Sequence, residues 1–194
     1  MSIDSPGTGE CPISAGTDAH RVYEAAIDAL RGHRAIDPDR VGCFGISFGG
    51  YWAVKMSLLR SDLAGVVNNG GPVHHSFNGR RLGQLPIGTK IALIRVLGLN
   101  LDVSTEQLSS RLAELSLVTQ GLLPTQRYSP LLSVNGDLDE LVSIRDLHLM
   151  SEMGVRQDRL TFGNDRHCAS QNRRLHQEFI ADWFAQRMGI SFGV

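Results

Sequence analysis

The chain has 194 residues, of which 42% are hydrophobic and 20% charged, with 19 basic against 20 acidic side chains. This composition is typical of one globular domain, so a disordered, collagen-like or coiled-coil chain is excluded. No long run of one charge occurs, so the sequence lacks the charge pattern of a nucleic-acid-binding protein, and we expect no nucleic-acid partner.

Cysteine content and the apolar segments bear on location. Cys11, Cys43 and Cys168 are odd in number and lack a CxxC spacing, which argues against a disulfide framework and a zinc site. The first ten residues have neither the basic region nor the apolar run of a secretory signal. The longest apolar stretch, 87–101, contains charged side chains and is too short to cross a bilayer. We therefore expect a cytoplasmic protein without a membrane span, metal or other cofactor.

The first half of the chain predicts a strand, a turn and a helix in close succession. Residues 2–3 could end a short strand, and 17–33 carry apolar residues at helical spacing. A short apolar run at 41–45 ends in glycine and indicates a strand. The pattern of 47–60, directly after it, is helical.

Three further strands are predicted at 63–69, 130–136 and 159–162. The last helix, 172–188, should pack on the sheet through five apolar side chains, namely Leu175, Phe179, Ile180, Trp183 and Phe184. Apolar strands that alternate with helices indicate a mostly parallel sheet with helices on both faces. The predicted class is α/β.

Between residues 75 and 127 the alternation of strand and helix breaks, and two helical patterns follow each other at 91–97 and 104–119. The second opens with Ser104 and Gln107 at the spacing of a capping box and places Leu108, Leu112 and Leu115 on one stripe. We interpret this region as a helical lid inserted into one domain that spans residues 1–194.

The segment from Gly45 to Gly49 has the pattern G-x-S-x-G between a predicted strand and a predicted helix. This context is typical of a nucleophile elbow, in which a strained turn exposes a serine hydroxyl above the sheet. Ser47 would be the nucleophile, and the backbone N–H of Phe48, at the start of the helix, would donate to a developing oxyanion. The simpler alternative is a glycine-rich turn that carries a serine by chance.

A serine needs a base and an orienting carboxylate, which should follow in the order Ser, acid, His. Asp139 follows the strand at 130–136, with Asp137 and Glu140 as rivals for the same role. His167 lies in the loop before the last helix, where the base is expected, although a surface histidine could stand there by chance.

Other residues near these segments are secondary candidates. His74 and His75, at the start of the lid, could line the pocket or act as an alternative base, or they could simply be exposed loop residues. Ile46, next to Ser47, is expected to contact substrate. Cys168, beside His167, is interpreted as a packing residue and not as a nucleophile.

Several segments together resemble one family: DSPGTGE, GCFGISFGG, NNGGPVHH, SLVTQGLL and NGDLDELV. They are similar to the α/β-hydrolases grouped with the fermentation-respiration switch protein, which include fungal pigment polyketide-shortening hydrolases. The resemblance implies an α/β-hydrolase fold with Ser47 as nucleophile, Asp139 as acid and His167 as base. Some relatives of the switch protein lack the elbow serine, and this sequence keeps it.

The sequence departs from that family at its front. Members carry several strands before the D-x-P-G-x-G segment, which here starts at Asp4. We therefore expect a sheet truncated at the N-terminus, without the loop that normally supplies the second oxyanion donor. Loss of one such donor typically costs about a hundred- to a thousandfold in rate. The alternatives are a fragment, a truncated gene product, or a subunit whose sheet is completed in a homo-oligomer or by a partner chain.

The leading hypothesis is a serine hydrolase that cleaves an ester, or a carbon–carbon bond next to a ketone, through an acyl-enzyme. Leu93, Leu97 and Leu112 in the lid suggest an apolar acyl group or a small aromatic ketide, although they could simply pack the lid onto the body. The alternatives are a catalytically silent protein that binds a partner through its exposed sheet edge, and an acyltransferase with the same triad.

Overall fold

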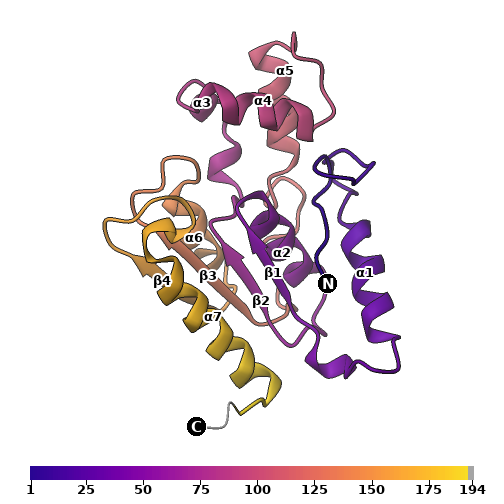
Figure 1. The fold of residues 1–194 in the computed structure, drawn as a ribbon. Helices are drawn as coiled ribbons and strands as arrows, with labels where there is room; N and C mark the ends of the chain where they lie inside the picture. Colours follow the sequence, from indigo (N-terminus) through magenta and orange to yellow (C-terminus); the bar gives the residue numbers. More distant parts are fainter. Residues whose placement is uncertain (192–194) are drawn as a thin grey trace.

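The computed structural model describes residues 1–191, and in this part of the chain four strands form one sheet (Figure 1). The strands lie in chain order: β1 (Cys43–Ile46), β2 (Val66–Asn69), β3 (Leu131–Gly136) and β4 (Gln157–Phe162). All three neighbouring pairs are parallel. The carboxyl ends of the strands therefore meet at one edge of the sheet, where ligands gather in open α/β folds.

The predicted strands are found, except the one at residues 2–3. Ile3 is exposed, and the residues that follow fold as turns in which Asp4 Oδ2 accepts a hydrogen bond from the Glu10 amide. These local hydrogen bonds satisfy the backbone without a neighbouring strand. The prediction of a strand at residues 2–3 was wrong.

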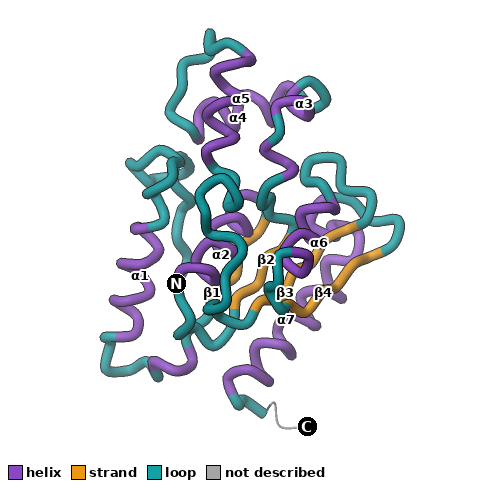
Figure 2. Tube along the Cα trace, turned by 180° about the vertical axis from the view of Figure 1, so that it is seen from behind, coloured by secondary structure: helices purple, strands orange, loops and turns teal. Residues whose placement is uncertain are grey.

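Helices cover both faces of the sheet, as the alternation of strands and helices predicted (Figures 1 and 2). Helices α1 (Arg21–Arg31), α2 (Phe48–Leu59) and α6 (Ile144–Glu152) contribute to one apolar core with Val66 and Leu131 of the sheet. Helix α7 (Arg173–Met188) lies on the opposite face, where its side chains pack against Val67, Leu132 and Val134.

The buried face of α7 differs from the predicted one. Ile180 and Trp183 are buried, but Leu175 and Phe179 are 58% and 44% exposed, and His176 is buried instead. Residues 176, 180 and 183 follow the i, i+4, i+7 spacing of one helix face, and residues 175 and 179 lie about 100° away from it. The inclusion of Leu175 and Phe179 in the packing face was therefore wrong.

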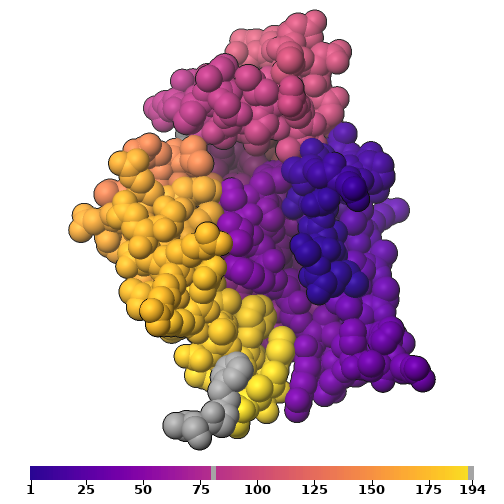
Figure 3. All heavy atoms as spheres, viewed as in Figure 1, coloured from indigo at the N-terminus to yellow at the C-terminus, as the bar shows by residue number. Residues whose placement is uncertain are grey.

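The chain between β2 and β3 forms a separate helical block above the carboxyl ends of the strands, with a hollow beneath it (Figures 1 and 3). Its helices are α3 (Gly79–Leu82), α4 (Ile87–Val96) and α5 (Thr105–Glu114), which we call the α3–α5 segment. Ser104 and Gln107 form the predicted capping box. Helix α5 ends at Glu114, five residues before the predicted end, and the Ser116 hydroxyl then accepts from the Thr119 amide in the following turn.

Within residues 1–191 there are also three short 3₁₀ helices: η1 (Pro38–Arg40), η2 (His75–Phe77) and η3 (His167–Asn172). Both η2 and η3 follow strands at the carboxyl edge of the sheet. They bring loop residues close to the N-terminus of α2, where Ser47 lies. No helix in the described residues is long and apolar enough to cross a membrane.

Candidate active site

Ser47 lies in a strained turn between β1 and α2. Its φ of 53° and ψ of −123° fall in a region that side-chain-bearing residues rarely adopt, at a cost of about 1–3 kcal/mol. Gly45 makes the turn possible, since a Cβ there would lie 2.1 Å from the Gly49 carbonyl oxygen. This geometry is that of a nucleophile elbow.

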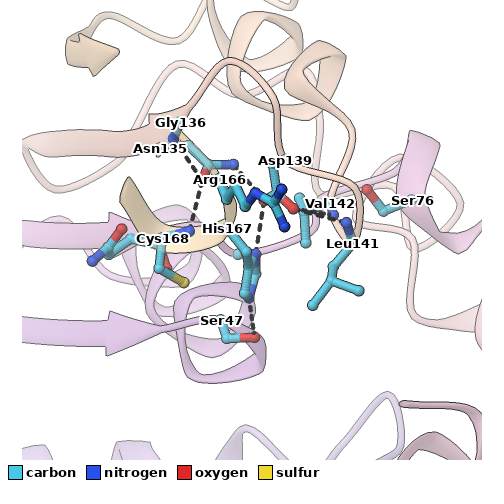
Figure 4. A network of polar contacts seen from close by, with 12 residues as sticks. Ser47, Ser76, Asn135, Gly136, Asp139, Leu141, Val142, Arg166, His167 and Cys168 are labelled. Carbon is cyan, nitrogen blue, oxygen red and sulfur yellow. Dashed lines mark hydrogen bonds and ion pairs between the residues drawn. The ribbon is translucent and has the colours of Figure 1, made fainter. Parts of the chain in front are cut away.

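Three side chains from separate parts of the chain form a continuous hydrogen-bonded series (Figure 4). The Ser47 Oγ lies 2.8 Å from His167 Nε2, and His167 Nδ1 lies 2.7 Å from Asp139 Oδ2. Because a carboxylate only accepts, Nδ1 carries the proton and the free lone pair of Nε2 faces the serine hydroxyl. The arrangement can move a proton from Ser47 to His167.

The Asp139 carboxylate is enclosed and fully hydrogen-bonded. Its side chain is 0% exposed, and its Oδ1 accepts from the Leu141 and Val142 amides at 2.8 and 3.0 Å. Burial would raise the pKa of Asp139, but hydrogen bonds from His167, Val142 and the Asn135 side chain outweigh it and lower the pKa below its ordinary value. Asp139 therefore remains an anion beside the imidazole.

The same contact affects the base. Burial lowers the pKa of His167, but the hydrogen bonds and charges of Asp139 and Cys168 together raise it by more, to about 9. Only a neutral imidazole can accept the serine proton. The contact that orients His167 therefore also stabilises the protonated form, which cannot act as a base.

A second buried carboxylate fixes the loop that carries His167. Asp165 is 0% exposed, and it accepts from the amides of Arg166, Gln171 and Asn172 and from the Asn172 side chain. Within this loop Cys168 and Ala169 adopt positive φ values of 59° and 50°. The hydrogen bonds to Asp165 offset that strain and hold His167 over Ser47.

The structure separates Asp139 from its rivals. Asp137 and Glu140 are exposed, and the carboxylate of Asp139 is the one at hydrogen-bonding distance from His167. The Cys168 thiol donates to the Asn69 carbonyl oxygen at 3.3 Å, while the Ser47 hydroxyl faces the imidazole.

A cavity of about 100 Å³ opens beside Ser47 and His167. Its wall is mainly apolar and is formed by Phe48, Pro72, Ser76, Phe77, Leu85, Thr89, Leu93, Leu112, Leu141 and Val142. Leu93 and Leu112 come from the α3–α5 segment, but Leu97 is buried away from the cavity.

Three predicted substrate contacts are not at this cavity. Ile46 is 51% exposed on β1, and His74 and His75 lie just before Ser76 without lining the space. The His74 ring instead contacts the Ser116 hydroxyl at 2.6 Å. Their neighbours Ser76 and Phe77, which no sequence motif marks, line the cavity.

The Phe48 amide begins α2 beside the serine. The first N–H groups of a helix have no acceptor within the helix, so this amide can donate to an oxygen above Ser47. Among the described residues no group of three or more His, Cys, Asp or Glu side chains could hold a metal ion.

Comparison with known proteins identifies the family. The family model described as "Esterase FrsA-like" matches residues 1–189. The chain belongs to the FrsA-like esterase family. Esterase FrsA of Enterobacter sp. (strain 638) is 31% identical over 136 residues, which cover 69% of this chain and 33% of that protein. Esterase FrsA of Escherichia coli O81 (strain ED1a) is 27% identical over 191 residues, or 97% of this chain and 45% of that protein.

Solved structures show the fold of this FrsA-like chain. The 2,6-dihydroxy-pseudo-oxynicotine hydrolase superposes with a TM-score of 0.82 at 22% identity, covering 98% of this chain and 53% of the other. AbyA5 superposes with a TM-score of 0.79 at 19% identity, covering 96% of this chain and 54% of the other. The α/β hydrolase GrgF from Penicillium sp. sh18 superposes with a TM-score of 0.68 at 13% identity, covering 96% of this chain and 79% of the other. The predicted α/β-hydrolase fold and family resemblance are confirmed.

The chain spans about half the length, or less, of the curated FrsA relatives it matches. The activity of these relatives is therefore a proposal for this chain.

Proposed function

We propose that this chain is a serine hydrolase that cleaves esters through an acyl-enzyme, with Ser47 as nucleophile, His167 as base and Asp139 as the orienting acid. The observation that carries the proposal is the series Ser47 Oγ, His167 Nε2, His167 Nδ1 and Asp139 Oδ2, with contacts of 2.8 and 2.7 Å. Its chain order is that of α/β-hydrolases.

Acylation begins when Ser47 Oγ attacks the ester carbonyl carbon and its proton passes to His167 Nε2. The carbonyl oxygen becomes an anion that the Phe48 amide stabilises. The intermediate then collapses, the bond to the alcohol oxygen breaks, and the departing alcohol takes the proton from His167. Asp139 stabilises the imidazolium while it exists.

Deacylation repeats these steps with water. His167 takes a proton from a water molecule, whose oxygen attacks the acyl carbon of the Ser47 ester. The second oxyanion collapses, the bond to Oγ breaks, and His167 returns the proton to Ser47. A carboxylic acid leaves and the enzyme is restored.

The substrate class follows from the cavity. A mainly apolar space of about 100 Å³ beside the nucleophile suits a short aliphatic acyl chain or one small ring. The α3–α5 segment contributes Leu93 and Leu112 to its wall, so we propose that this segment acts as a lid over the substrate.

A fluorophosphonate probe tests the proposal, because it labels a serine only when a base has activated it. We expect one adduct at Ser47, mapped by mass spectrometry, and hydrolysis of p-nitrophenyl acetate and butyrate. Both should disappear in Ser47→Ala, while the Ser61→Ala variant, at an exposed position after α2, should behave as wild type. Full esterase activity in Ser47→Ala would refute the mechanism.

One observation favours a second function, partner binding. Strand β1 is an edge strand of the described sheet, Phe44 and Ile46 on it are 46% and 51% exposed, and Phe44 lines a groove of about 510 Å³. Unpaired edge strands are ready docking sites. Light scattering after size exclusion tests this: a dimer that Phe44→Glu converts to a monomer supports pairing at β1, and a wild-type monomer argues against self-pairing.

The same triad could cleave a carbon–carbon bond next to a ketone or pass the acyl group to another acceptor. Product analysis separates these reactions: an added alcohol that captures the acyl group in competition with water indicates transfer. A cytoplasmic location is part of this proposal, since Cys11, Cys43 and Cys168 are all free thiols.

A further inference from the structure

Asn135 is a buried polar side chain at the carboxyl end of β3, next to the proposed triad. It is 2% exposed and does not line the cavity beside Ser47. A buried amide needs hydrogen-bond partners, because an unpaired one costs about 1–3 kcal/mol. The partners of this amide lie on both loops that carry triad residues (Figure 4).

Each end of the Asn135 amide contacts a different part of the site. Its Nδ2 donates to Asp139 Oδ2 at 2.8 Å, the same oxygen that accepts from His167. Its Oδ1 accepts from the backbone amides of Gly136 and Cys168, both at 2.9 Å. Cys168 directly follows His167, so one side chain spans the acid loop and the base loop.

These contacts fix the orientation of the amide. A flipped Asn135 would place its NH₂ against two N–H donors and its oxygen against a carboxylate, which is unfavourable at both ends. The acid loop is also close to the base loop through the backbone, since the Leu138 amide donates to the Asp165 carbonyl oxygen at 2.9 Å. The Nδ2 of Asn135 is therefore fixed as the donor to the acid loop, and its Oδ1 is fixed as the acceptor from the base loop.

We propose that Asn135 is a positioning residue. It holds the Asp139 carboxylate and the His167 loop in the relative positions at which Ser47, His167 and Asp139 form hydrogen bonds. The proposal rests on the function proposed above. Asn135 touches no reacting atom. It acts by orienting Oδ2 of Asp139 and by limiting how much charge that oxygen presents to His167.

Two substitutions separate the donor and acceptor ends. Asn135→Asp keeps an oxygen for the Gly136 and Cys168 amides but places a second carboxylate against Asp139. Two carboxylates about 3 Å apart cannot both ionise, so at neutral pH they share one proton, and the N–H donor to Asp139 is lost without a gain in net charge. Asn135→Ala removes both ends. Ser133→Ala is the matched control, because Ser133 lies two residues earlier on the same face of β3, is fully buried, and bonds Gln157 instead of the triad.

The first measurement is an NMR titration of the His167 ring, assigned with a His167→Gln variant, which needs no turnover. We expect the midpoint in Asn135→Ala to rise by about half a pH unit over wild type, because Asp139 Oδ2 loses a donor and presents more charge to His167. The midpoint in Ser133→Ala should remain that of wild type. An unshifted midpoint in folded Asn135→Ala would overturn the proposal, whether or not the protein proves to be an esterase.

The second measurement is ester hydrolysis by Asn135→Ala, with Asn135→Asp measured beside it to cover the case in which Asn135→Ala fails to fold. We expect kcat to fall about ten- to a hundredfold with KM changed less than about twofold, because the cavity wall is intact. Urea unfolding of Asn135→Ala and Ser133→Ala controls for stability. Equal kcat values in these two variants would contradict a positioning role, while loss of activity in Ser47→Ala alone bears on the proposed function.

Discussion

Removal of the Asp146 carboxylate should destabilise the wall of the cavity. Asp146 is 0% exposed on α6, and its two oxygens accept from the backbone amides of Val73, His74, His75 and Ser76 at 3.1, 3.0, 2.6 and 3.0 Å. One carboxylate thus fixes the chain that leads from β2 into η2, where Ser76 and Phe77 line the cavity.

The magnitude follows from these four contacts. A hydrogen bond to a charged group contributes about 1.5–3 kcal/mol, and the carboxylate in Asp146→Ala is lost from all four amides together. Allowing for water that enters the space, we expect the free energy of unfolding to fall by about 4 kcal/mol. For a chain of this size that corresponds to a Tm lower by about 8–16 °C. Asp146→Asn keeps one acceptor oxygen but turns its NH₂ toward two of the amide donors, so it should lose at least as much.

Thermal and urea unfolding measure the effect, with exposed Asp102→Asn as the control, which should change the unfolding free energy by less than about 0.5 kcal/mol. KM for a short-chain ester should rise in Asp146→Asn because Ser76 and Phe77 lose their fixed position. An Asp146→Ala variant as stable as wild type would refute the reasoning, since it would mean that the four amides find other acceptors.

Three further predictions concern catalysis. With neutral His167 as the proposed base and its pKa raised to about 9 by contacts with Asp139 and Cys168, kcat/KM should rise with pH through a midpoint well above 6.5; a pH–rate profile with a midpoint at or below 6.5 would contradict this. Asp139→Asn should lower kcat by about 10⁴-fold and move that midpoint down, whereas Asp137→Asn, at an exposed position, should do neither in the same assay. Leu93→Ala should widen the cavity and shift kcat/KM across a p-nitrophenyl ester series toward longer acyl chains, with exposed Leu101→Ala as the control; an unchanged ranking would exclude Leu93 from the acyl pocket.

The proximity of Ser47, Asp139 and His167 could be predicted because each follows a strand of a parallel sheet. Parallel strands present their carboxyl ends at one edge, so the order of strands in the sequence already brings these loops together. The choice of Asp139 over Asp137 could not be made this way. It depends on which of several adjacent carboxylates turns inward, and the structure shows that the Leu141 and Val142 amides hold that of Asp139.

The supporting residues were not predictable from sequence pattern. Asn135, Asp146 and Asp165 are polar residues in or beside apolar segments, and each binds backbone amides that lie far away or in irregular turns. A polar residue at the end of a buried strand, such as Asn135, is a usable signal, but its partners are set by loop conformation. The exposure of Leu175 and Phe179 on α7 has a similar cause, because the sheet face below determines which side of the helix is buried.

The hydrogen bonds of these supporting residues explain how the loops at the site keep strained backbone conformations. Ser47, Cys168 and Ala169 all have positive φ values, which together cost about 3–9 kcal/mol if each costs about 1–3. Such conformations persist only where the surroundings determine them, and here Asp165 binds the start and the end of the loop while Asn135 binds Cys168 between them. A Cys168→Gly substitution would relieve part of the strain and should leave stability nearly unchanged. It should also make the His167 loop more mobile, so kcat should fall while stability does not, which separates positioning of the base from the stability of the fold.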